Sequence, residues 1–192
     1  SKCMIETTKS LVEEFHPKIA YTQSDEITLL WYLEENFPSA EYPFNGRKQK
    51  LVSILAGFAS SLFTLNMKKY FPNKEAVPCF DRRVWNVPTK EDVVENFSWR
   101  SWDARKNSVT MAASSVYSHK ELLNKNTQVK LGMLNSKGID WNAYPNFFRC
   151  GTFLARENYR VTLTEEEYNN IPEKFKPETK EVIRSRVGEV LI

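Results

Sequence analysis

The stretch that most constrains the fold covers residues 19–32, with the sequence Ile-Ala-Tyr-Thr-Gln-Ser-Asp-Glu-Ile-Thr-Leu-Leu-Trp-Tyr. Two apolar runs, rich in β-branched and aromatic residues, flank the short polar segment Ser24-Asp25-Glu26, which is the pattern of a β-hairpin. Adjacent carboxylates repel each other and are poor strand formers, so they belong at the junction between the strands. We therefore expect a hairpin that presents Asp25 and Glu26 at the edge of a sheet.

This acidic tip has two interpretations. It can be a solvated turn, or it can hold a hard cation such as Mg²⁺, which combines oxygen ligands from one or two carboxylates with substrate phosphates. The strongly apolar flanking runs carry the acids toward a sheet interior, and this favours the cation.

Composition narrows the class of protein. The 192 residues are 41% hydrophobic and 13% aromatic, so we expect one domain with appendages that buries a core. The formal net charge of +3 permits a nucleic-acid partner without requiring one. The three cysteines are far apart and there are only two histidines, so neither a disulfide framework nor a zinc site is indicated. We expect a reducing, cytoplasmic compartment.

Helices are expected where apolar residues recur at spacings of three and four and end signals flank them. They cover residues 1–15, 47–70, 89–117 and 127–136, and Thr89 begins the third with a capping box. The second contains the most apolar stretch, which polar residues interrupt. We expect this stretch to be too short to span a bilayer and to form a buried helix, with no membrane partner.

The remaining segments are expected as strands, loops and a last helix. Residues 80–87 are expected to form a strand, and residues 148–163 two short strands that turn near Glu157-Asn158. A polar loop is expected over residues 34–46, because proline and glycine punctuate it. A helical stretch is expected near residues 180–190.

The hexamer Tyr21-Thr22-Gln23-Ser24-Asp25-Glu26 resembles the second metal motif of the tRNA(His) guanylyltransferase-like family, the polymerases that add nucleotides to the 5′ end of tRNA in the 3′-to-5′ direction. The similarity continues in the same order through four further blocks, residues 47–63, 78–83, 98–108 and 137–151. It covers roughly residues 1–156. The segment 117–122 is most similar to the bacterial and phage members.

The resemblance implies an α+β fold, a ferredoxin-like antiparallel palm with long helices on one face and a helical C-terminal extension. Residues 1–118 would form the palm-like catalytic core, and residues 119–192 a helical and β-hairpin extension packed on the same core. Family members carry another metal ligand on a first strand that precedes the opening helix, and residues 1–18 contain no such segment. We therefore expect a central slot in the sheet that another segment fills, or else an inactive fragment.

The resemblance also implies the function, which is template-dependent nucleotidyl transfer to the 5′ end of tRNA, of the 5′-end repair type, with ATP and GTP as substrates and two Mg²⁺ ions. The implied catalytic and metal-binding residues are Asp25 and Glu26. The implied nucleotide-binding residues are Ser24, Arg47, Lys50, Arg83, Asp103 and Asn107. The implied tRNA-binding residues are Arg100, Arg105, Lys120 and Lys125. The expected assembly is a homo-tetramer built as a dimer of dimers.

The residues themselves leave alternatives open at two of these places. Arg47 and Lys50 lie three apart in the first turn of a helix, where they form either a triphosphate clamp or a solvated basic helix start. Asp103 and Asn107 recur with Trp99 at intervals of four on a semi-buried face, so their polar groups need partners. Those partners are either each other, or the nucleotide and the tRNA.

Two positions depart from the family pattern. Arg82 stands where the family usually has glycine, which puts the local turn in doubt and adds a cation for a phosphate. Arg105 stands where the eukaryotic members carry histidine, and this favours the repair-type members over selective guanylate addition.

Two other classes of function are compatible with parts of the sequence. A nucleotidyl cyclase shares a palm with an acidic hairpin tip but does not need the blocks at residues 98–107 and 137–151. A non-catalytic tRNA-binding protein is compatible with the missing first carboxylate.

Overall fold

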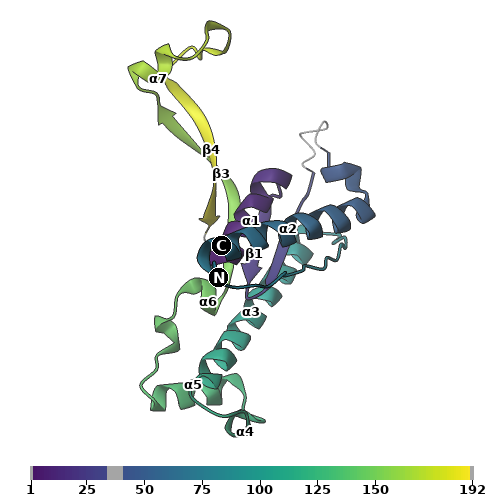
Figure 1. Ribbon diagram of the computed structural model, residues 1–192, viewed down its shortest axis with the longest axis vertical. Helices are drawn as coiled ribbons and strands as arrows, with labels where there is room; N and C mark the ends of the chain where they lie inside the picture. The colour runs from purple at the N-terminus through teal and green to yellow at the C-terminus, as the bar shows by residue number, and fades with distance from the viewer. Residues whose placement is uncertain (1, 34–40, 191–192) are drawn as a thin grey trace.

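The computed structural model describes residues 2–33 and 41–190 and is built around one four-stranded antiparallel sheet (Figure 1). The strands are β1 (Ile19–Gln23), β2 (Glu26–Leu30), β3 (Thr152–Thr162) and β4 (Glu181–Val190). Their order in the sheet is β2-β1-β3-β4, and each adjacent pair is antiparallel. The expected α+β class is confirmed.

The rest of the described chain is helical or irregular. The longer helices are α1 (Lys2–Phe15), α2 (Lys48–Tyr70), α3 (Lys90–Ser114) and α5 (Thr127–Ser136). The shorter elements are η1 (Pro43–Gly46), α4 (His119–Leu122), η2 (Trp141–Ala143), α6 (Asn146–Arg149), α7 (Glu165–Asn169) and η3 (Glu173–Phe175). The four helices expected from periodicity are all present, and Thr89 caps α3 as expected. Residues 34–40 of the expected polar loop lie outside the described residues.

The expected hairpin is confirmed. β1 and β2 pair from Ile19 with Leu30 to Gln23 with Glu26, so only Ser24 and Asp25 remain in the turn. Ser24 accommodates the tight turn with a φ of 48°. Glu26 is therefore fixed by the ladder, whereas Asp25 projects from the tip.

Helices cover both faces of the sheet. On one face Val12 of α1 packs in a core cluster with Ala20. On the other, the ring of Phe97 in α3 lies 6.3 Å from that of Tyr21 and 5.7 Å from that of Phe153. The expectation of long helices on one face is wrong, because neighbouring residues of β1 and β3 point apolar side chains to opposite faces and both need cover.

The expectation of a central slot in the sheet is wrong, because the described strands form a sheet without a gap. β1 lies directly between β2 and β3, with Tyr21 opposite Phe153. The unpaired edges are instead the outer edges of β2 and β4, neither of which has a further strand partner within residues 2–33 and 41–190.

Residues 80–87 form no strand, which corrects a third expectation. Their backbone has no ladder partner, and side chains hold the segment in place instead. Phe80 and Val84 pack on the apolar cluster beneath α2, and the Phe80 N–H donates to Ser60 Oγ at 2.9 Å.

The C-terminal part corrects two more expectations. β3 continues unbroken through Glu157, which pairs with Arg186, so there is no turn near Glu157-Asn158. Residues 181–190 form β4 rather than a helix, because β-branched residues favour strands and β3 supplies a partner along the whole of β4. The two strands extend beyond the sheet as a ribbon with α7 at its far end (Figure 1).

α2 is long and apolar enough, by length and composition alone, to cross a membrane. It has 23 residues and a mean hydropathy of 1.3 in its most apolar window, so the expectation that this region is too short is wrong. In the fold, however, Leu51, Leu55 and Ala59 of α2 pack with Leu11 of α1 in one core cluster. A single such helix is weak evidence for a membrane, since the core helix of a soluble protein passes the same test. The expected buried helix is only partly so, because 22% of that window is buried.

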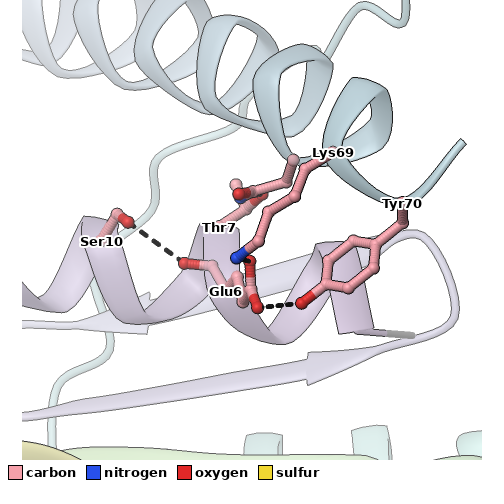
Figure 2. Close-up of polar contacts among 6 residues, drawn as sticks. Glu6, Thr7, Ser10, Lys69 and Tyr70 are labelled. Atoms are coloured by element: carbon pink, nitrogen blue, oxygen red, sulfur yellow. Dashed lines mark hydrogen bonds and ion pairs between the residues drawn. The ribbon is translucent and has the colours of Figure 1, made fainter. Parts of the chain in front are cut away.

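A polar cluster around Glu6 joins α1 to the last turns of α2 (Figure 2). The Tyr70 hydroxyl donates to Glu6 Oε1, and Lys69 Nζ lies 3.3 Å from Glu6 Oε2. Beside them, Asn66 Nδ2 donates to Thr7 Oγ1 at 3.2 Å. The hydrogen bond from Tyr70, with help from the charge of Lys69, holds the pKa of the Glu6 carboxyl below its ordinary value of 4.5.

This lowered pKa predicts a pH-dependent contribution to stability. Ionised Glu6 stabilises the fold above about pH 4.5, and that contribution is lost as the pH falls through the lowered pKa. We expect Glu6→Gln to lower the melting temperature at neutral pH, with a difference from wild type that shrinks on acidification. Circular dichroism melts across this range measure it. Glu14→Gln, an exposed position on the same helix, is the control and should behave as wild type. A Glu6→Gln difference that does not change with pH would contradict the account.

Gly151 predicts a second stability effect. Its φ is +78°, and a Cβ there would lie 2.5 Å from the Tyr21 hydroxyl, which donates to the Cys150 carbonyl at 2.7 Å. Gly138 has a similar φ of +72° but open space around it. We expect Gly151→Ala to cost about 3 kcal/mol or more and Gly138→Ala about 1 kcal/mol, as measured by urea unfolding. Equal losses would mean that the close approach of Tyr21 is unimportant.

Candidate functional site

A hollow of about 660 Å³ lies along the open edge of β2, between α2, α3 and residues 80–87. We call it the edge cleft. Its apolar wall comes from the core residues of α2. Its charged lining residues are Asp25, Glu26, Lys48, Asp81, Arg82, Arg83 and Arg100. The cleft therefore brings the acidic hairpin tip together with cations from three other segments.

An ion pair holds Glu26 in the cleft. Arg100 Nη1 donates to Glu26 Oε2 at 2.8 Å, and Gln23 Nε2 donates to the same oxygen at 3.0 Å. α3 places Arg100 there because Phe97, three residues earlier, packs on the sheet. Asp25 is exposed and has no polar partner within residues 2–33 and 41–190, so it is the carboxylate open to a ligand.

Arg82 is a partly buried cation in the cleft wall. Its guanidinium carbon lies 5.7 Å from the centroid of the Trp31 ring, and its buried Nε has no hydrogen-bond partner among the described residues. Burial lowers the pKa of Arg82 to about 10, so the side chain stays charged at neutral pH. A desolvated cation with an unused donor favours binding of an anion.

Two of the residues expected to bind nucleotide lie at the cleft or beside it. Arg83 lines the cleft with an exposed side chain, and its Nε lies 3.9 Å from Asp81 Oδ2. Ser24 is the exposed turn residue next to Asp25.

The start of α2 presents a different cation from those expected. Arg47 and Lys50 are exposed and do not line the cleft, whereas Lys48 does. Lys48 lies three residues before Leu51 and seven before Leu55, so it shares the helix face that turns to the core and the cleft.

Asp103 and Asn107 of α3, which were expected to bind nucleotide, form a hydrogen bond with each other. Asn107 Nδ2 donates to Asp103 Oδ2 at 2.9 Å, one helical turn away, and neither residue lines the cleft. Of the two alternatives left by the sequence, the structure shows the mutual hydrogen bond.

The four residues expected to bind tRNA lie on α3, on α4 and just after α4, and do not form one surface. Arg100 lies in the edge cleft, and Arg105 lies over the ring of Trp141 at 4.8 Å. Lys120 and Lys125 are exposed in and after α4, at the end of α3 away from the sheet (Figure 1). A helix as long as α3 spans about 37 Å, so these lysines contact a different part of any large ligand.

Lys48, Asp81 and Asn96 line the cleft but were not predicted as site residues. Asn96 precedes Arg100 by four residues, so helical spacing alone could have identified a shared face. The sequence marked Arg82 as an added cation, but not its burial, which depends on a segment that has no regular structure.

The cleft residues fit a metal ion that is shared with a bound ligand. Mg²⁺ takes one or two protein carboxylates and completes its shell with water and phosphate oxygens. Asp25 supplies one carboxylate, and Glu26 a second if Arg100 gives way. Within the described ranges no three His, Cys, Asp or Glu side chains gather to hold an ion by themselves.

Comparison with known proteins confirms the resemblance. The family model described as "Thg1: tRNAHis guanylyltransferase" matches residues 1–88. The chain is 30% identical over 177 residues to the tRNA(His) guanylyltransferase of Debaryomyces hansenii, covering 81% of this chain and 63% of that protein. It is 28% identical over 169 residues to a probable tRNA(His) guanylyltransferase of Drosophila melanogaster, covering 81% and 56%. The chain thus spans less than two thirds of the length of these curated relatives.

Solved bacterial structures share the fold. A bacterial tRNA(His) guanylyltransferase-like protein in complex with ATP aligns with a TM-score of 0.74 and 30% identity, over 81% of this chain and 66% of that one. A bacterial tRNA(His) guanylyltransferase-like protein in complex with GTP aligns with a TM-score of 0.71 and 25% identity, over 98% of this chain and 68% of that one.

The position of Arg82 predicts opposite effects on stability and binding. A buried guanidinium without a full set of partners destabilises a fold, so we expect Arg82→Met to leave the unfolding free energy unchanged or raise it by about 1 kcal/mol. The same change should weaken binding of inorganic tripolyphosphate about tenfold, measured by calorimetry, because a charge-assisted hydrogen bond is lost. Arg160→Met, an exposed arginine on β3, should alter neither quantity. A less stable variant with normal tripolyphosphate binding would make Arg82 a purely structural residue.

Proposed function

Because the chain belongs to the tRNA(His) guanylyltransferase (Thg1) family, we propose that it is a nucleotidyltransferase that adds nucleotides to the 5′ end of tRNA in the 3′-to-5′ direction. The edge cleft is its active site. One observation carries the proposal, which is the convergence of the acidic hairpin tip and cations from three segments on a single hollow. That charge arrangement suits a metal-bound triphosphate, with the acids toward the metal and the cations toward the phosphates.

The cations of the edge cleft would each contact part of the triphosphate. Lys48 at the start of α2, with Arg82 and Arg83 from residues 80–87, would neutralise the phosphate oxygens. The substrates are ATP and GTP, and the complexes of similar bacterial proteins with these two nucleotides support that assignment.

The hairpin tip would hold Mg²⁺. Asp25 would be the first ligand, and Glu26 would be the second if Arg100 released it. When bound, the ion polarises the phosphoryl group and lowers the pKa of the attacking hydroxyl. A second ion would need further oxygen ligands, which Asp81 of the cleft lining, phosphate and water could supply.

We assign the chain to the template-dependent, 5′-end repair type. Two features support this subtype. Arg105 stands in place of histidine, and the sequence of residues 117–122 is most similar to the bacterial and phage members. A homo-tetramer and a cytoplasmic location stay predictions.

The test of the proposal is extension of a tRNA that lacks its first nucleotide and carries a 5′-monophosphate. With ATP, GTP and Mg²⁺ we expect the wild type to restore the missing nucleotide. Asp25→Asn should slow extension about 100-fold or more, because a metal ligand contributes several kcal/mol to the transition state. Glu178→Gln, an exposed acid outside the cleft, is the matched control and should extend at the wild-type rate.

Other outcomes select other functions. Normal extension by Asp25→Asn would remove this carboxylate from the chemistry. A wild type that binds tRNA without extending it would be a tRNA-binding protein. Cyclic products formed from nucleoside triphosphates alone would identify a cyclase.

A further inference from the structure

A second hollow, of about 380 Å³, lies on the other side of α3 from the edge cleft. We call it the α3 groove. Val93 and Phe97 line both hollows, so α3 forms the wall between them. Beyond this shared wall, Ser98, Trp102 and Arg105 face the groove at helical spacings of four and three.

The groove has aromatic walls and one strongly exposed ring. Phe97, Trp102 and Phe153 line it, and Trp102 is 70% exposed. The other four tryptophans of the chain are all less exposed. A large flat apolar ring that stays open to solvent beside a hollow is typical of a surface on which a ligand stacks.

One cation, Arg105, lines the groove, and a second, Arg149, stacks on the same tryptophan as the first. Arg105 lies over one side of the Trp141 ring at 4.8 Å, and Arg149 lies over the same ring at 5.2 Å. Neither arginine forms an ion pair with a carboxylate among residues 2–33 and 41–190. Positive charge next to an exposed aromatic ring suits a nucleobase that carries its own phosphate.

Building on the proposed function, we propose that the α3 groove binds an unpaired nucleobase of the tRNA substrate, stacked on Trp102, with its phosphate at Arg105. At about 380 Å³ the groove lies at the lower end of the range for ligand sites, which suits one base better than a nucleoside triphosphate. Only α3 separates this base from the edge cleft, so the RNA strand would be held beside the triphosphate site.

Binding measurements test this assignment. We expect Trp102→Ala to weaken binding of the 5′-truncated tRNA about tenfold, the loss typical of one stacked base. Trp102→Phe should retain most of the affinity, since a ring remains. Phe175→Ala removes an aromatic ring that is 72% exposed but lies outside both hollows, and it should bind tRNA as wild type does. The affinity for ATP should be the same in the wild type and in the three variants. Because Trp102 is so exposed, its loss should leave the fold intact, which circular dichroism checks.

Fluorescence gives an independent readout. A base stacked on Trp102 should quench tryptophan emission when tRNA is added, and Trp102→Phe should abolish most of that quenching. Sedimentation of the wild type and Trp102→Ala shows whether the groove instead joins two copies of the chain.

Four results would overturn the assignment. Unchanged tRNA affinity in Trp102→Ala, with normal extension by the wild type, rejects the groove and leaves the proposed function in place. A loss of ATP affinity instead makes the free nucleotide the occupant, and a loss of self-association makes a second copy the occupant. A wild type that neither binds nor extends tRNA rejects the proposed function, and the groove assignment with it.

Discussion

The arrangement of the site depends on how α3 is held on the sheet, and the ion pair between Arg100 and Glu26 is one of the contacts that hold it. It joins α3 to the hairpin tip at 2.8 Å, and Phe97 anchors the same helix to the sheet through the rings of Tyr21 and Phe153. Together these contacts fix α3 across one face of the sheet. The edge cleft then lies on one side of α3 and the α3 groove on the other, so one helix positions both candidate binding surfaces.

The charges of the edge cleft are arranged for a ligand rather than for stability. Arg82 is desolvated without a carboxylate partner, and Asp25 stays unpaired although cations line the same hollow. An isolated fold gains nothing from keeping unlike charges apart in this way. Local violations of stability rules occur where a site needs them, and a bound metal with its triphosphate would satisfy both sets of charges at once.

Local signals in the sequence predicted local structure well. The hairpin, the four longer helices and the capping box at Thr89 each depend on residues only a few positions apart, and all are present. The sequence predicted two short strands where β3 is one long strand, and a helix where β4 lies. Both predictions failed because the pairing of these strands depends on residues distant in the chain. Tyr21, for example, donates to the carbonyl of Cys150, 129 residues away. The site followed the same division, since Asp25 and Glu26 were evident from the hairpin, whereas the part of Lys48 and the burial of Arg82 depended on tertiary packing.

The central claim is that the hairpin tip and the surrounding cations bind one metal-triphosphate complex together. The most direct measurement is the dissociation constant of ATP, with and without Mg²⁺, for the wild type and for Asp25→Asn. The account predicts that Mg²⁺ tightens ATP binding by about tenfold or more in the wild type and has little effect in the variant, because Asp25 is the protein ligand that couples the two. An identical response to Mg²⁺ in both proteins would contradict it.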